Sequence, residues 1–162
     1  MTARVIDRPM RPLFPKDYRN DCTLNNLVLS VDTECRPELV AMLGSAIATS
    51  ISDIPFAGPC ATTQLGMIDG KFIVNPSQEQ WDNGDLNLTV ASTSEKVIMI
   101  EAGANEIPED KMIEAIYMCH EVNQEIIAFI NKMVDEIGKP KHAYTSFSVT
   151  LRTFSSLVCL SS

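Results

Sequence analysis

The segment from Pro108 to Gly138 places the strongest limit on what this chain can fold into. Its apolar residues recur every three or four positions, which is the spacing of one face of an α-helix. Glu109 and Asp110 stabilise the positive end of such a helix, and Gly138 followed by Pro140 ends it. We therefore predict a long helix that buries one face against another layer. That face comprises Met112, Ile113, Ile116, Cys119, Ile126, Ile127, Ile130, Met133, Val134 and Ile137.

Alternating sequence upstream predicts the strands of that other layer. Residues 64–76 contain Asp69-Gly70 between two apolar runs, which is a strong signal for a β-hairpin. Residues 85–93 and 95–103 alternate apolar and polar side chains and predict a second antiparallel pair. Between these units, residues 77–83 predict a short helical turn.

Two further elements are expected nearer the start of the chain. Residues 22–32 end in alternation, with Leu27, Leu29 and Val31 on one side, and predict another strand. Residues 36–53 carry apolar side chains at helical spacing, and their many small residues suit a helix pressed closely against a sheet.

Composition is that of one water-soluble domain. The chain has 162 residues, of which 45% are hydrophobic and 21% charged. It has no apolar run of membrane-spanning length and no secretory leader, so we expect a cytoplasmic protein without membrane contact. Its five cysteines form no CxxC pair, which favours reduced thiols over a zinc site or a disulfide framework.

Charge is divided unevenly along the chain. The net charge is −8, yet residues 1–19 hold five basic and two acidic side chains, a net of +3. The remainder holds eight basic and nineteen acidic groups, a net of −11. A focused basic patch still binds phosphate groups on an acidic protein, so residues 1–19 are the expected anion-binding end.

Several segments, in the same order and spacing, resemble one family. The chain is similar to bacterial polynucleotide phosphorylase, and specifically to the first of its two RNase PH-like repeats. The matching stretches are ARVIDRPMRPLFPKDYRND (3–21), LVLSVD (27–32), PELVAMLGSAIATSISDIPFAGP (37–59), DGKFIVNPSQEQ (69–80), DLNLTVAST (85–93) and MIEAGANEIPEDKMIEAI (99–116).

The resemblance implies an α+β fold of the RNase PH type, with a mixed or antiparallel sheet packed against helices. Residues 1–144 would be a partial first domain, incomplete at its N-terminal side, and residues 145–162 a divergent tail that is out of frame or disordered. The family degrades RNA, including mRNA, from the 3′ end with inorganic phosphate as co-substrate. It uses Mg²⁺ and assembles as a homotrimer around an RNA channel.

Within this resemblance the catalytic groups are expected in the second repeat. The turn corresponding to the phosphate cradle, residues 31–39, offers Thr33 and Arg36 but no glycine or serine. Glu79 and Asp85 are six residues apart in the segment that resembles the metal-binding stretch, but such spacing is common in loops. We therefore predict no catalytic residue and no metal ligand here. His120 is expected to be a structural histidine within the long helix.

RNA contact is the expected role of Arg4, Arg8 and Arg11. Their spacing would align them along one side of a helix, and the guanidinium fork suits phosphate. Pro9 disturbs that alignment because proline disfavours helical backbone in the preceding residue. Lys16 and Arg19 are weaker candidates. Alternatively, Arg4 and Arg8 pair with Asp7 or other acids and only stabilise the fold.

The predicted function is thus that of a non-catalytic part of a polyribonucleotide nucleotidyltransferase, contributing RNA contact and a trimer scaffold. The alternative is an inactive stand-alone fragment that binds RNA or oligomerises. We also expect the chain to associate when it is expressed alone, because an unpaired sheet edge and an apolar face would be exposed.

Overall fold

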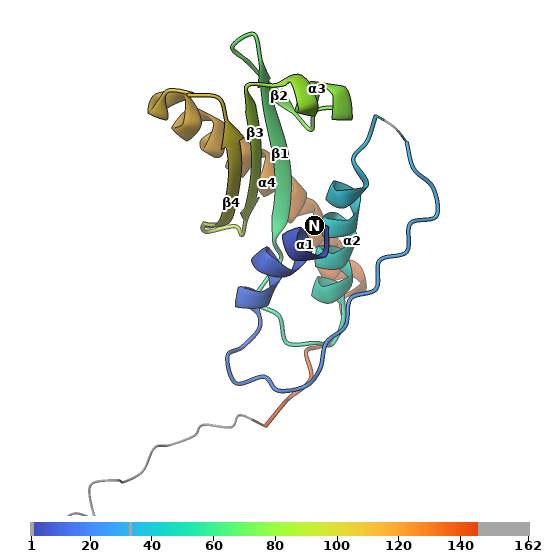
Figure 1. Cartoon of the computed structure of the whole chain (residues 1–162). Helices are drawn as coiled ribbons and strands as arrows, with labels where there is room; N and C mark the ends of the chain where they lie inside the picture. Colours follow the sequence, from blue (N-terminus) through green and yellow to red (C-terminus); the bar gives the residue numbers. More distant parts are fainter. Residues whose placement is uncertain (1, 33, 146–162) are drawn as a thin grey trace, which may run out of the picture.

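Four antiparallel strands form the central sheet, in the order β2-β1-β3-β4 (Figure 1). The computed structural model describes residues 2–32 and 34–145. The strands are β1 (Ala61–Ile68), β2 (Lys71–Val74), β3 (Leu86–Ser92) and β4 (Val97–Ala104). Both predicted antiparallel units are therefore confirmed. β1 also pairs with β3, which joins the two units into one sheet.

The turn between β1 and β2 explains why Asp69-Gly70 correctly predicted a β-hairpin. Ile68 pairs with Lys71, so only Asp69 and Gly70 form the turn. Both have positive φ angles, 50° and 76°. A two-residue hairpin turn of this kind requires left-handed backbone at both positions, which Asp tolerates and Gly adopts freely.

Three helices lie where the sequence predicted them, and two more, α1 and η1, lie at the start of the chain. They are α1 (Thr2–Met10), the 3₁₀ helix η1 (Arg11–Leu13), α2 (Pro37–Ile51), α3 (Gln78–Asn83) and α4 (Glu109–Ile137). α3 begins with a capping box, in which the Ser77 hydroxyl accepts from the Gln80 N–H and the Gln80 side chain accepts from the Ser77 N–H. α4 crosses behind the sheet, and α1 and α2 lie at one end of it (Figure 1).

α4 contributes to two hydrophobic clusters and so connects the two parts of the fold. Its first half covers one face of the sheet, and its second half packs with α1 and α2. The sheet cluster comprises Leu65, Met67, Leu86, Leu88, Val90, Ala115 and Cys119. The helical cluster comprises Ile6, Met10, Leu13, Met42, Ala46, Cys60 and Ile130.

Asn123 lies on α4 between these clusters and is completely buried. Its Oδ1 accepts a hydrogen bond of 2.8 Å from the Thr63 hydroxyl on β1. Its Nδ2 donates to the Val90 carbonyl, at 3.1 Å, and to the Ser92 hydroxyl, at 2.9 Å, on β3. Burying an amide is costly unless it is hydrogen-bonded, and these three bonds connect α4 to both central strands.

The strand predicted within residues 22–32 is wrong. The segment has no regular secondary structure and is exposed throughout, with Leu27 and Leu29 exposed by 83% and 88%. A strand is stabilised by a partner ladder, and no described strand lies beside this segment. Its side-chain anchor is Asn26, which exchanges hydrogen bonds with Ser45 on α2 at 3.0 and 3.2 Å.

The expected disturbance of Arg8 by Pro9 is also wrong. Arg8 and Pro9 both lie within α1. Pro9 is almost at the end of the helix, and it is completely buried beside Met10. Burial of this apolar face offsets the intrinsic preference of the residue before proline.

Residues 139–144 return along the C-terminal end of α2. The Lys139 and His142 amides donate to the Ile51 and Asp53 carbonyls, at 2.9 and 2.7 Å. The Lys141 ammonium donates to the carbonyls of Thr49, Ser50 and Ser52, which end the helix. Desolvation lowers the pKa of Lys141, and the charge of Asp53 opposes that effect. The predicted divergent tail lies outside the described residues beyond Thr145.

Asn123→Ala should destabilise the fold more than most buried substitutions. The change leaves a cavity and removes the hydrogen-bond partners of Thr63 and Ser92, so we expect a loss of about 2–4 kcal/mol in the free energy of unfolding. Urea unfolding followed by circular dichroism measures it. The control Asn105→Ala alters an exposed asparagine. An Asn123→Ala midpoint equal to that of the control would contradict the role given to this amide.

Candidate nucleic-acid interface

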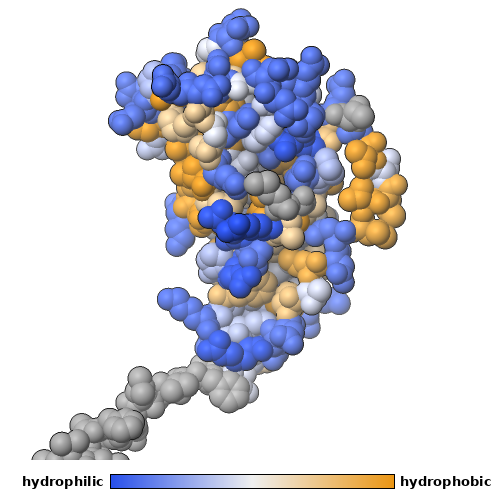
Figure 2. Space-filling view, in the orientation of Figure 1, coloured by the Kyte–Doolittle hydropathy of each residue, from blue (hydrophilic) through white to orange (hydrophobic). Residues whose placement is uncertain are grey.

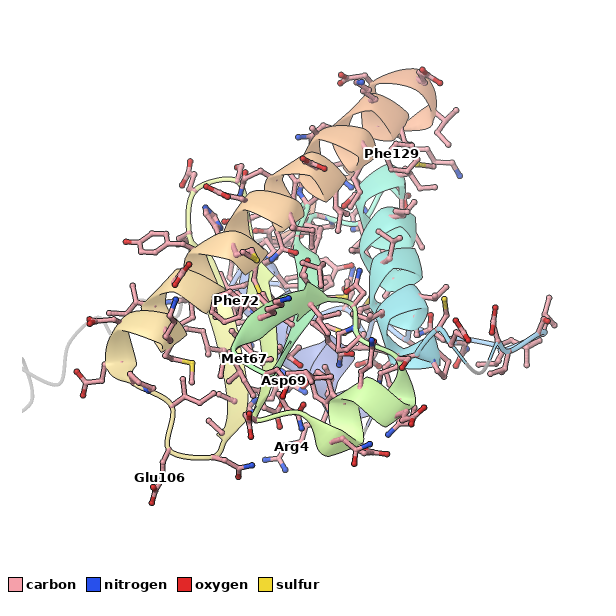
Figure 3. The ribbon with its side chains drawn as sticks, turned by 90° about the horizontal axis from the view of Figure 1, so that it is seen from above. Arg4, Met67, Asp69, Phe72, Glu106 and Phe129 are labelled. Atoms are coloured by element: carbon pink, nitrogen blue, oxygen red, sulfur yellow. The ribbon has the colours of Figure 1, made fainter. Side chains whose placement is uncertain are left out.

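The outer face of α1 presents two arginines one helical turn apart. Ile6 and Met10 turn inward to the helical cluster, whereas Arg4 and Arg8 are exposed. Strongly hydrophilic surface lies over α1 (Figure 2), and the Arg4 side chain points away from the body of the protein (Figure 3). Within residues 2–32 and 34–145, neither guanidinium has an ion-pair or hydrogen-bond partner.

Arg11, the third predicted arginine, is held by Asp7. Its Nη2 lies 2.7 Å from both carboxylate oxygens and its Nε lies 3.1 Å from both. Hydrogen bonding to Asp7, followed by the attraction of its charge, raises the pKa of Arg11. The pair neutralises itself, although the Arg11 side chain remains 76% exposed. Asp7 therefore pairs with Arg11, and the alternative in which it pairs with Arg4 or Arg8 is wrong.

The basic segment is consequently less cationic than its sequence suggests. Arg4 and Arg8 supply its unneutralised charge on α1, and Lys16 and Arg19 are exposed beyond η1. Asp17, between these two, accepts a hydrogen bond of 3.0 Å from the Tyr144 hydroxyl. The structure thus brings Arg4 and Arg8 together as a pair of cations facing solvent.

Arg36, which was expected at the phosphate cradle, stacks its guanidinium on an aromatic ring instead. Its guanidinium carbon lies 4.2 Å from the centre of the Trp81 ring, a cation–π distance. Its Nε and Nη1 are enclosed without a hydrogen-bond partner within the described residues, and Nε lies 3.9 Å from the Glu38 carboxylate. Arg36 therefore packs α3 against the start of α2. Thr33, the other expected cradle residue, lies outside the described residues.

The carboxylates considered for metal binding do not form a common site. Glu79 lies in the first turn of α3, and Asp85 follows Gly84 at the entry to β3. Asp85 is fixed through its backbone, whose N–H donates to Met67 and whose carbonyl accepts from Asn105. In the described part of the chain, no three His, Cys, Asp or Glu side chains lie close enough to hold a metal ion.

The surroundings of Cys60, Cys119 and His120 indicate structural roles for these side chains. Burial raises the pKa of Cys60 to about 11 and that of Cys119 to about 12, so both are protonated at neutral pH. His120 on α4 is half-buried and lies 3.3 Å, through Nε2, from the Gln124 amide nitrogen. That amide also donates to the Thr93 carbonyl, so the contact connects α4 to the end of β3.

Two interactions were not predicted from the sequence: the hydrogen bonds of Asn123 and the contact between Arg36 and Trp81. Asn123 lies four residues after Cys119 and four before Ile127, within the apolar stripe of α4. A polar residue at such a position signals a buried hydrogen-bond network. The contact between Arg36 and Trp81 left no comparable signal, because it joins residues far apart in the chain.

Comparisons with known proteins agree with the resemblance. The family described as "3' exoribonuclease family, domain 2" matches residues 58–122. A polyribonucleotide nucleotidyltransferase of Lachnoclostridium phytofermentans is 66% identical over 157 residues, which is 97% of this chain and 22% of that protein. Polyribonucleotide nucleotidyltransferase 2 of Alkaliphilus metalliredigens is 54% identical over 141 residues, or 87% of this chain and 20% of that protein.

A solved structure supports the fold. Rice (Oryza sativa) Rrp46 superposes with a TM-score of 0.55 at 13% identity, covering 64% of this chain and 49% of the other. None of the helices in the described ranges is both long and apolar enough to cross a membrane. The chain spans about a fifth of the length of the curated relatives it matches. Along nearly all of its own length the chain is similar in sequence to polyribonucleotide nucleotidyltransferases, and its fold is of the RNase PH type.

Proposed function

We propose that this chain is part of a phosphate-dependent 3′-to-5′ exoribonuclease and contributes RNA contact within it. The outward pair of Arg4 and Arg8 carries this proposal. A guanidinium donates two parallel hydrogen bonds to a phosphate, and exposed arginines without an internal acceptor are available to do so. The relatives, which are polyribonucleotide nucleotidyltransferases, supply the class of substrate.

The position of the pair suits a phosphate backbone. Arg4 and Arg8 lie one helical turn apart, on a helix whose other face is fixed in the protein core. A rigid helix presents both cations without the entropic cost of ordering a loop. Contacts to phosphate depend little on base identity, so we expect binding to RNA of any sequence.

We place the chemical step outside this segment, in the second repeat of the parent enzyme. Arg36 stacks on Trp81, Asp85 is held by its backbone at the sheet entry, and Glu79 is exposed on α3. These residues do not fit a phosphate cradle or an Mg²⁺ centre, so Mg²⁺ and inorganic phosphate are assigned to the parent enzyme. In this proposal the chain is the first repeat, scaffolds a cytoplasmic homotrimer and has no membrane partner.

Reversing both charges should weaken RNA binding. Arg4→Glu/Arg8→Glu should lower the affinity for an oligoadenylate and flatten the plot of log K against log salt by about 1.4, because two phosphate contacts are lost. Fluorescence anisotropy over a salt series measures both quantities. Lys132→Glu/Lys139→Glu makes the same change in net charge on exposed lysines elsewhere. Equal losses in the two double variants would refute a specific contact at α1.

Releasing Arg11 should have the opposite effect. Asp7→Asn removes the carboxylate that neutralises this guanidinium, so RNA affinity should rise and the salt dependence should steepen by about 0.7. Asp135→Asn removes the same charge from an exposed site on α4 and serves as the control. If both variants bind alike, Arg11 does not reach the RNA.

A phosphorolysis assay tests whether the chain only binds RNA or also cleaves it. The purified 162-residue chain should bind polyadenylate but release no nucleoside diphosphate when given Mg²⁺ and phosphate, with a full-length polynucleotide phosphorylase as the positive control. Release of nucleoside diphosphate by the chain alone would place a catalytic centre within it. Absence of RNA binding would favour the alternative of a fragment that only oligomerises.

A further inference from the structure

Residues 139–144, which we call the clasp, follow α4 and join two distant parts of the chain. One part is the end of α2. The Lys139 amide donates to the Ile51 carbonyl at 2.9 Å, and the Lys141 ammonium donates to three carbonyls at 2.7–3.2 Å. The last carbonyls of a helix have no intrahelical partner, so a cation placed among them is stabilised. The clasp is thereby anchored on a rigid element.

The other part is the turn that follows η1, beside which the clasp passes (Figure 1). The Tyr144 hydroxyl donates a hydrogen bond of 3.0 Å to the Asp17 carboxylate, across 127 positions of sequence. The Tyr144 ring meets the Tyr18 ring edge-on, with their centres 5.4 Å apart, and the His142 ring lies 6.0 Å from Tyr18. A hydrogen bond to a carboxylate is stronger than a neutral one, and an edge-on aromatic pair adds to it.

The turn itself, residues 14–19, has no helix or strand of its own. Its beginning is fixed to the segment after α2, because the Ala57 amide donates to the Leu13 carbonyl at 2.8 Å and the Phe14 and Phe56 rings lie 5.2 Å apart. Its second half is contacted by the clasp. A segment without a backbone ladder depends on such side-chain contacts for its order.

Two cations flank the residues that the clasp contacts. Asp17 and Tyr18 lie between Lys16 and Arg19, and both basic side chains are exposed. In the part of the chain that the structure describes, neither basic side chain forms an ion pair. The Tyr144 hydroxyl is an uncharged donor, so it fixes the turn without changing its charge. Cations on an ordered turn lose less conformational entropy when they bind phosphate.

We propose that Tyr144 is a positioning residue for phosphate contact: through Asp17 and Tyr18, the clasp keeps Lys16 and Arg19 ordered as a second pair of cations for an RNA backbone. The inference rests on the proposed function, which supplies RNA as the ligand. It adds that residues after α4 control phosphate binding by residues that precede α2.

Hydrogen exchange of the 162-residue chain, followed by mass spectrometry, tests the order of the turn. Tyr144→Phe removes the hydroxyl and keeps the ring, and Tyr117→Phe makes the same change at an exposed tyrosine on α4. The amides of residues 16–20 should exchange faster in the first variant only. Tyr144→Ala also removes the ring contact with Tyr18 and should accelerate their exchange further. Unchanged exchange in both Tyr144 variants would overturn the proposal.

Binding to an oligoadenylate, measured by fluorescence anisotropy over a salt series, tests the phosphate contact. Lys16→Gln/Arg19→Gln should flatten the plot of log K against log salt by about 1.4, because two contacts are lost. Tyr144→Phe should lower the affinity about two- to fivefold at about 0.1 M salt, because those contacts are weakened. In the Lys16→Gln/Arg19→Gln background, Tyr144→Phe should leave the affinity unchanged, because Tyr144 acts through these two cations.

An equal loss of affinity from Tyr144→Phe in the two backgrounds would overturn the proposal, because Tyr144 would then act elsewhere. So would RNA binding by Lys16→Gln/Arg19→Gln that equals that of the unmodified chain. Failure of the proposed contact at α1 gives a different pattern: Arg4→Glu/Arg8→Glu would bind like its control while the coupling between Tyr144 and the two cations persists. A chain that binds no RNA would refute both proposals.

Discussion

The hydrogen bonds of the Asn123 amide, formed on a helix that serves two hydrophobic clusters, are the constraint on which the rest of the structure depends. Apolar packing alone would allow α4 to slide or rotate over the sheet at modest cost. Three directional bonds, to Thr63, Val90 and Ser92, fix its position against two strands. Ile130, two turns further along α4, belongs to the same hydrophobic cluster as Ile6 and Met10 of α1. The basic helix is thereby placed by the same element that covers the sheet.

This arrangement accounts for the character of the candidate interface. Arg4 and Arg8 project from a helix whose inner face is buried, so their separation is set by helical geometry. Arg11 begins a different element, η1, and forms an ion pair with Asp7, whose carboxylate neutralises its charge. A row of three arginines in the sequence thus becomes a pair of available cations beside a neutral ion pair. In the proposed function, this pair supplies two phosphate contacts, whose number sets the expected salt dependence of binding.

Sequence reasoning succeeded where the determining interactions are local. The Asp69-Gly70 turn, the short helix predicted within residues 77–83 and the ends of α4 each depend on residues within one turn of one another. The pairing of Arg11 with Asp7 is also local, and its spacing of four residues would have allowed its prediction.

Sequence reasoning failed where the interacting residues are distant in the chain, or where the described residues include no partner. The alternation in residues 22–32 is genuine, but a strand requires a ladder, and sequence alone does not reveal whether a neighbour exists. The partners of Asn123 lie 60, 33 and 31 residues away, at Thr63, Val90 and Ser92. Pro9 was misjudged because its local preference was weighed without the burial that the fold provides at that position.

The central claim is that α4 makes the sheet and the α1–α2 pair a single cooperative unit, so that the arginines of α1 are held by the whole fold. Hydrogen exchange followed by mass spectrometry on the dilute chain tests it directly. The amides of α1, α2, β1 and β3 that exchange most slowly should share one opening free energy, equal to the global free energy of unfolding and equal to that of the middle of α4. If α1 and α2 open at a clearly lower free energy while the sheet and α4 remain protected, the two clusters are independent and the account is wrong.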